Sequence, residues 1–129
     1  MISWADYFNG RDEEYPDELT QERIDNALLV IAKGNQVLER FGKTRVVSSG
    51  WRPPSVNAAT PGAAPKSNHV ECKALDFADH DRELCAFLTA NDGAVLKELD
   101  LYMEDPKDTP TWAHIQTCPP KSGRRIFGR

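Results

Sequence analysis

The chain has 129 residues, of which 40% are hydrophobic and 28% charged, and its formal net charge is −4. This composition is typical of a folded protein, and the length suits a single domain over residues 1–129 rather than two. No apolar run approaches the roughly 20 residues that cross a bilayer, so we expect no membrane insertion, and the scattered basic residues argue against nucleic acid as a ligand.

The cysteines and the N-terminus indicate a cellular compartment. Cys72, Cys85 and Cys118 cannot all pair within one chain, and they form no Cys-x-x-Cys motif. Free thiols in a reducing compartment therefore fit better than a disulfide framework. The first residues contain neither the basic nor the apolar segment of a signal peptide, so we expect synthesis in the cytoplasm without one.

The first third of the chain predicts two helices. Ser3 is a candidate N-cap for a short helix over residues 3–9. A longer helix is expected from Thr20 to Gly42, and Gly34 weakens its middle enough that it could break in two. Its apolar stripe is better explained by packing than by a ligand. The stripe contains Ile24, Leu28, Ile31, Leu38 and Phe41, and it is widened by Leu29, Ala32 and Val37.

The rest of the chain mixes short strands with one helical stretch. A helix is expected to start at Asp79 or Asp81, with a further turn over 94–99. Residues 52–67 are proline-rich and predict a long loop of the kind that is usually functional. This pattern predicts an α+β fold, a small antiparallel sheet with helices packed on one side. The expected strands are 44–48, 74–77, 101–103 and 112–116.

Two of the three histidines, His69 and His114, and Asp76 are candidate metal ligands, because zinc prefers nitrogen and carboxylate donors. In one helix, His69 and Asp76 would lie about 10.5 Å apart along the axis. In one strand they would point to opposite faces. Only a bend near residues 71–73 brings both to one ion. Spacing alone leaves open that His69 is a packed histidine and Asp76 a cap, and we interpret His80 as a solvated residue at a helix start.

A joint motif resembles a known family. The segments Ser-Gly-Trp-Arg-Pro-Pro at 49–54, Ser-Asn-His at 67–69 with Asp76 after six further residues, and Trp-Ala-His at 112–114 resemble the D-Ala-D-Ala carboxypeptidases, or M15 peptidases. That family includes VanX- and VanY-type enzymes and phage endolysins that cut peptidoglycan peptides. The resemblance covers about residues 45–127 and implies a hedgehog/DD-peptidase-like fold.

The resemblance also implies roles for five residues. His69, Asp76 and His114 would bind Zn²⁺, which polarises a carbonyl and lowers the pKa of water toward about 7. Arg52 would stabilise the oxyanion and, with Ser67, bind the substrate. The simpler alternatives are that Arg52 forms an ion pair within its loop and that Ser67 caps a turn.

Two positions depart from the family pattern. The family's glycine three residues after the first histidine is Cys72 here. A left-handed cysteine costs about 1–2 kcal/mol, so we expect the bend to use an ordinary φ, or the Cys72 thiolate to bind the metal. The family's acidic residue three positions before the last histidine is Thr111 here. A general base must then come from elsewhere, and we prefer Glu104, at a strand end, to Asp108, in a turn.

The sequence therefore predicts a zinc metallopeptidase that hydrolyses an amide bond in peptidoglycan peptides. We expect a phage-encoded D,D-carboxypeptidase or endolysin-type endopeptidase that acts at the bacterial cell wall as a monomer. A zinc-binding structural domain of the same fold that has lost turnover is the alternative, because Thr111 replaces the acid. A thiol enzyme that uses Cys72 is a third reading.

Overall fold

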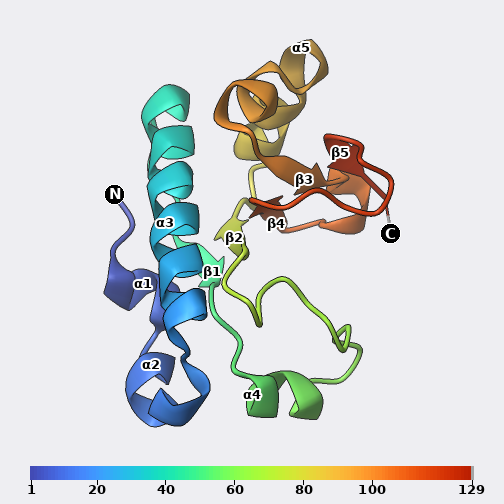
Figure 1. Cartoon of the computed structure of the whole chain (residues 1–129). Helices are drawn as coiled ribbons and strands as arrows, with labels where there is room; N and C mark the ends of the chain where they lie inside the picture. The colour runs from blue at the N-terminus through green and yellow to red at the C-terminus, as the bar shows by residue number, and fades with distance from the viewer. Residues whose placement is uncertain (129) are drawn as a thin grey trace.

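The computed structural model describes residues 1–128 (Figure 1). Its α-helices are α1 (Trp4–Phe8), α2 (Arg11–Glu14), α3 (Gln21–Phe41), α4 (Pro54–Ala59) and α5 (Glu83–Leu99), with 3-10 turns η1 (Pro16–Glu18) and η2 (Pro106–Asp108). Its strands are β1 (Val47–Ser49), β2 (Ala74–Ala78), β3 (Tyr102–Glu104), β4 (Trp112–Gln116) and β5 (Ile126–Phe127). Within this part of the chain, no helix is both long and apolar enough to cross a membrane.

The five strands form one sheet in the order β1-β2-β4-β3-β5. The first four pair antiparallel, whereas β5 runs parallel to β3. The α+β class with a small antiparallel sheet is therefore confirmed, and β5, which was not predicted, adds one parallel pair at the edge. That strand has two residues, too few to show an alternating pattern, and it pairs through Met103 N to Arg125 O and Asp105 N to Phe127 O.

Alternation along β2 and β4 divides their side chains between two faces of the sheet. Leu75, Phe77 and Ile115 are fully buried on one face, where α3 and α5 contact the strands. Asp76 and His114 occupy the alternate positions and therefore point to the other face. The helices pack on one side, as expected, and the opposite face of the sheet is available for a site.

The long helix α3 is continuous and does not break at Gly34. Thr20 caps its start by accepting a bond from Arg23 N, and Gly42 ends it with a left-handed φ of 81°. At Gly34, an added Cβ would lie 3.1 Å from Ile2 Cδ1 and 3.3 Å from the Phe77 ring. The glycine therefore lets the helix approach the sheet closely rather than weakening it.

The predicted apolar stripe of α3 is only partly right. Leu38 is buried, but Leu28 is 54% exposed. The large apolar residues were favoured in the prediction, yet the closest approach to the sheet requires small ones. The buried positions of this helix are Ala27, Val30, Gly34, Val37 and Leu38.

Residues 52–67 are not the structureless loop that was expected, because α4 lies within them. Pro54 stands at the first helical turn, where a missing N–H is tolerated. The strand predicted at 44–48 begins later, at Val47. The other three predicted strands agree with β2, β3 and β4 to within one residue.

The N-terminal helix α1 is tied to the segment that follows β1. Ser3 forms a capping box with Asp6, which confirms the expected N-cap. At its other end, the Tyr7 carbonyl accepts a bond from Trp51 N, and a Cβ added to Gly50 would lie 1.9 Å from Tyr7 O. Only glycine allows this contact between two backbones.

We therefore expect Gly50→Ala to lower the free energy of unfolding by about 2–4 kcal/mol, because two backbone segments must separate. Urea denaturation followed by circular dichroism measures this change. Gly128→Ala is the control, since its Cβ would meet only a side-chain oxygen 4.0 Å away. Equal stability of both variants would show that the contact between α1 and Gly50 is not a constraint.

Both candidate caps of α5, Asp79 and Asp81, accept hydrogen bonds from backbone N–H groups at the start of this helix. Asp79 accepts bonds from Leu84 N at 3.0 Å and Cys85 N at 2.8 Å, and Asp81 accepts one from Glu83 N. A non-helical break over residues 90–93 precedes the expected final turn at 94–99. Burial opposes ionisation of Asp79, but the bonds from Cys85, Leu84 and Arg45 outweigh it and lower the pKa of this carboxyl from 3.8.

Because the folded pKa of Asp79 lies below its unfolded value, its carboxylate stabilises the fold fully above pH 3.8 and loses that effect as pH falls below it. We expect Asp79→Asn to lower the free energy of unfolding by about 1–2 kcal/mol near neutral pH. The difference from wild type should shrink below pH 3.8. Denaturation curves at several pH values test this, and a difference independent of pH would contradict it.

Candidate metal centre and adjoining cavity

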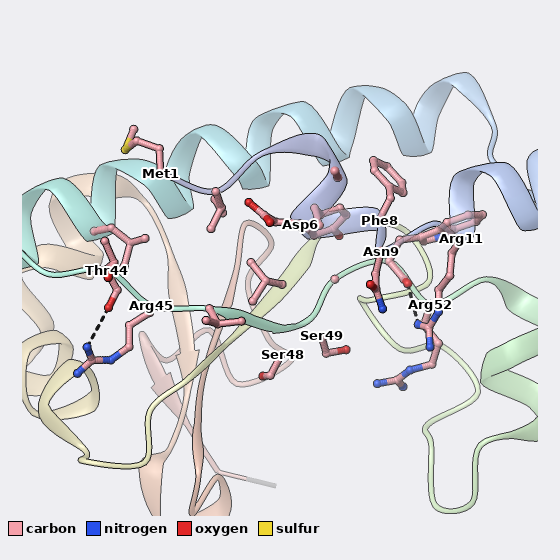
Figure 2. Close-up of a pocket in the computed structure, with 18 of the residues that line it drawn as sticks. Met1, Asp6, Phe8, Asn9, Arg11, Thr44, Arg45, Ser48, Ser49 and Arg52 are labelled. Atoms are coloured by element: carbon pink, nitrogen blue, oxygen red, sulfur yellow. Dashed lines mark hydrogen bonds between the residues drawn. The ribbon is translucent and has the colours of Figure 1, made fainter.

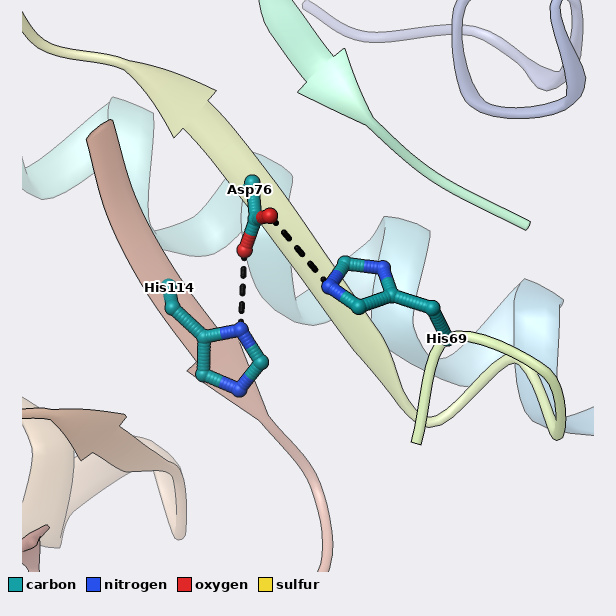
Figure 3. A group of neighbouring side chains, drawn as sticks. All are labelled: His69, Asp76 and His114. Carbon is teal, nitrogen blue, oxygen red and sulfur yellow. Dashed lines mark hydrogen bonds and ion pairs between the residues drawn. The ribbon is translucent and has the colours of Figure 1, made fainter. Parts of the chain in front are cut away.

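His69, Asp76 and His114 converge on the face of the sheet opposite the helices (Figure 3). One ligand atom from each lies within 4.8 Å of the others, and all three residues are buried. Asp76 on β2 is the direct cross-strand partner of His114 on β4. His69 reaches them from the turn that precedes β2, so the bend that the spacing requires is present.

That bend uses a left-handed residue, so the expectation of an ordinary φ is wrong. Cys72 has a φ of 59°, and its side chain is fully buried in the hydrophobic core. Burial raises the pKa of the Cys72 thiol to about 12, which keeps it protonated at neutral pH. It is not part of the group that could hold a metal, and its burial does not fit a nucleophile.

Each imidazole has one nitrogen facing Asp76 and one facing a carbonyl oxygen. In His69, Nδ1 lies 2.9 Å from Gly50 O and Nε2 lies 3.3 Å from Asp76 Oδ2. In His114, Nε2 lies 2.8 Å from Gln116 Oε1 and Nδ1 lies 2.8 Å from Asp76 Oδ1. Since a carbonyl oxygen only accepts, the outer nitrogens carry the protons.

This arrangement turns two imidazole nitrogens toward one carboxylate. Outer carbonyl partners that fix histidine tautomers are the usual second layer of a metal site. Two nitrogens and one carboxylate oxygen match the donors of three-ligand zinc sites, in which the fourth position stays open. The residues present therefore fit a zinc ion.

The pKa shifts of Asp76 and His114 also support a cation site. Burial disfavours the carboxylate of Asp76, but the bonds from His114 and His69 outweigh it and hold its pKa well below the ordinary value. Burial also lowers the pKa of His114, yet its bonds to Asp76 and Gln116, together with the charge of Glu104, raise it overall. The raised pKa of His114 arises from the carboxylate that its ring faces, and a cation bound there would be stabilised by the same negative charge.

A cavity of about 540 Å³ opens over the three residues. Glu104 lines it, whereas Asp108 does not, which favours Glu104 of the two candidate bases. Tyr102 is the cross-strand partner of Gln116, so Glu104, two residues on, lies on the same face as His114. The full lining is Arg52, Thr60, Pro61, Gly62, Ala63, Ala64, Ser67, Asn68, His69, Asp76, Glu104, Trp112, His114, Gln116 and Phe127.

The two predicted substrate-binding residues also line this cavity. Arg52 donates from Nη1 to Asn57 Oδ1 at 3.1 Å and forms no ion pair within the described residues, so the ion-pair alternative is wrong. Ser67 Oγ accepts a bond from His69 N at 3.2 Å, which is the turn-capping role. Thr111 is exposed and outside the lining.

Sequence reasoning missed Gln116 and Phe127. Gln116 lies two residues after His114 on the same strand, so the alternation of β4 could have placed it beside that ligand. Its amide nitrogen donates to Cys118 O at 2.8 Å, which fixes the oxygen toward His114. Phe127 contacts the His114 ring edge to face with centroids 6.2 Å apart, but it comes from the undetected strand β5.

Comparison with known protein families gives a match. The family model described as peptidase M15 matches residues 9–115. No curated protein and no solved structure matches the chain. The matched stretch begins earlier than the segment of resemblance found from motifs, so it includes α2 and α3, and it ends before the C-terminal tail. Because it covers most of the chain and contains the three converging residues, this protein belongs to the M15 peptidase family.

Proposed function

We propose that this protein is a zinc-dependent peptidase that hydrolyses an amide bond in bacterial peptidoglycan peptides, as a D,D-carboxypeptidase or an endolysin-type endopeptidase. The observation that carries the proposal is the convergence of His69, Asp76 and His114 beneath a cavity that Glu104 also lines. Membership of the M15 family supports a metallopeptidase. The two candidate activities, a phage origin and action at the cell wall are proposed from the resemblance of the motifs alone.

The predicted site residues each have a chemical role in this proposal. A zinc ion bound by the three residues supplies a Lewis acid and lowers the pKa of water. Glu104 takes the proton of the attacking water and passes it to the leaving amine. Arg52 donates to the oxygen that becomes negative during attack, where a fixed cation has its largest effect. Ser67 binds the substrate from the turn that also holds His69.

The alternative of a zinc-binding domain without turnover rests on Thr111, which replaces the family's acidic residue. The geometry weakens this alternative, because Thr111 is outside the cavity while Glu104 is one of its lining residues. Glu104 also contributes a charge that raises the pKa of His114, which reflects its closeness to that ring. The neighbouring strand therefore contributes a carboxylate to the lining of the cavity.

We expect Glu104→Gln to reduce hydrolysis about 10²–10⁴-fold, because the amide has no basic oxygen to accept the proton. Release of new amino groups from purified peptidoglycan, with products identified by mass, measures the loss and names the bond. Asp108→Asn is the matched control and should stay close to wild type. Activity retained in Glu104→Gln, or lost equally in both variants, would exclude Glu104 as the base.

We expect Gln116→Leu to weaken zinc binding about 10–100-fold, because His114 loses the acceptor that holds its outer N–H. Competition with a chromophoric chelator measures the affinity without turnover. Gln116→Glu keeps an acceptor oxygen and should retain tight binding. If both variants bind zinc like the wild type, Gln116 does not orient the ligand.

A further inference from the structure

A second cavity of about 650 Å³ shares lining residues with the metal cavity. Figure 2 shows the side chains that line it. It lies between the N-terminal segment, from Met1 to Arg11, and the stretch 44–52 that contains β1. Arg52 and Thr60 line both cavities, so the two are contiguous at these residues. A cavity of this size accommodates several residues of a peptide.

The end of this cavity nearest the metal site is positively charged. Arg11 donates from Nη1 to the carbonyl of Trp51 at 3.0 Å, which places its guanidinium beside Arg52. Figure 2 shows both side chains at the same end of the cavity. Within the described part of the chain, neither forms an ion pair with a carboxylate.

Two other charged side chains of the lining, Arg45 and Asp6, form contacts within the protein. Arg45 donates to Asp79 and Asp81, so it is neutralised. Asp6 is the one acidic residue among those lining the cavity, and its carboxylate accepts bonds from Ser3 in the capping box of α1. At the end nearest the metal site, the charged side chains of the lining are therefore those of Arg11 and Arg52.

The wall formed by β1 suits an extended chain. β1 is an edge strand, because it pairs with β2 alone. Ser48 is exposed and Ser49 half-buried along the cavity. A peptide in extended conformation can add to such an edge through backbone hydrogen bonds.

We propose that the second cavity binds the part of an acidic substrate peptide that lies beyond the scissile bond, with the Arg11 guanidinium, beside Arg52, receiving a carboxylate of that part. The inference rests on the proposed function for the identity of the peptide. Guanidinium groups bind carboxylates through paired N–H donors, which gives both charge and geometry. Arg11 comes from a segment outside the motifs, and its role here is in binding only.

The probe is the soluble stem pentapeptide L-Ala-γ-D-Glu-L-Lys-D-Ala-D-Ala, which has a free α-carboxylate in its middle. Its analogue with a carboxamide at that position is of equal size and lacks the charge. Dissociation constants are measured by calorimetry in the zinc-loaded Glu104→Gln background, so that no turnover occurs. We expect the acid to bind about five- to tenfold more tightly than the amide.

Adding Arg11→Gln should remove this preference, because glutamine can still donate to Trp51 O but has no charge. Arg11→Lys should restore part of it. The control is Arg124→Gln, an identical change at an exposed arginine outside both cavities, and it should leave the preference intact. Equal binding of acid and amide, no binding of either, or a preference that survives Arg11→Gln would overturn the inference.

The outcome is separable from that of the proposed function. If the wild type cleaves the pentapeptide and its amide analogue alike and binds them alike, the peptidase stands and the second cavity has no such role. If the preference depends on Arg11 but the wild type releases no product, the binding site stands and the peptidase proposal fails for this substrate.

Discussion

The carboxylate of Asp76, buried between two imidazoles, is the interaction on which the rest of the site depends. A buried charge is costly unless it is paired and hydrogen-bonded, and here each oxygen faces one histidine. The pairing exists because β2 and β4 are in a register that sets Asp76 opposite His114. A slip of one residue would turn Asp76 toward the core and bring Leu75 or Phe77 to the site.

The position of His69 depends on a different series of contacts, which begins at the N-terminus. Tyr7 O accepts a bond from Trp51 N, and the neighbouring Gly50 O faces Nδ1 of His69. The helix α1 thereby fixes the backbone that contacts His69, a candidate metal ligand more than sixty residues away in sequence. Residues that precede the motifs therefore contribute to the geometry of the site.

The sequence predicted those parts of the molecule that local rules determine. Caps at Ser3 and Asp79 follow from side chains that bond to backbone a few residues away. The three candidate ligands could be chosen because few residue types bind zinc and because their motifs resemble a family. In contrast, the buried face of α3 depends on how closely that helix approaches the sheet. Spacing does not contain that distance, so Gly34 was read as a weakness instead of a contact.

Gln116 and Arg11 show a second limit of prediction from sequence. Both are polar residues of ordinary types, and neither belongs to a motif. Gln116 acquires its role from its neighbour on β4, and Arg11 acquires its position from one bond to Trp51 O. Such roles are properties of tertiary contact, and a sequence pattern indicates them only when the strand register or the partner is already known.

At Cys72, in the bend between the candidate ligands His69 and Asp76, the free-energy cost of backbone strain opposes the gain from core burial. A left-handed φ in a residue with a Cβ costs about 1–2 kcal/mol, which glycine would avoid. The cysteine side chain is fully buried in the core, however, and burial of apolar groups returns about 0.8 kcal/mol for each CH₂ equivalent. Glycine would relieve the strain but leave that volume empty, and a void in a packed core also costs free energy. The chain can therefore keep the bend that unites His69 with Asp76 without the glycine that the family pattern has there, because core packing on one side of the turn offsets backbone strain within it.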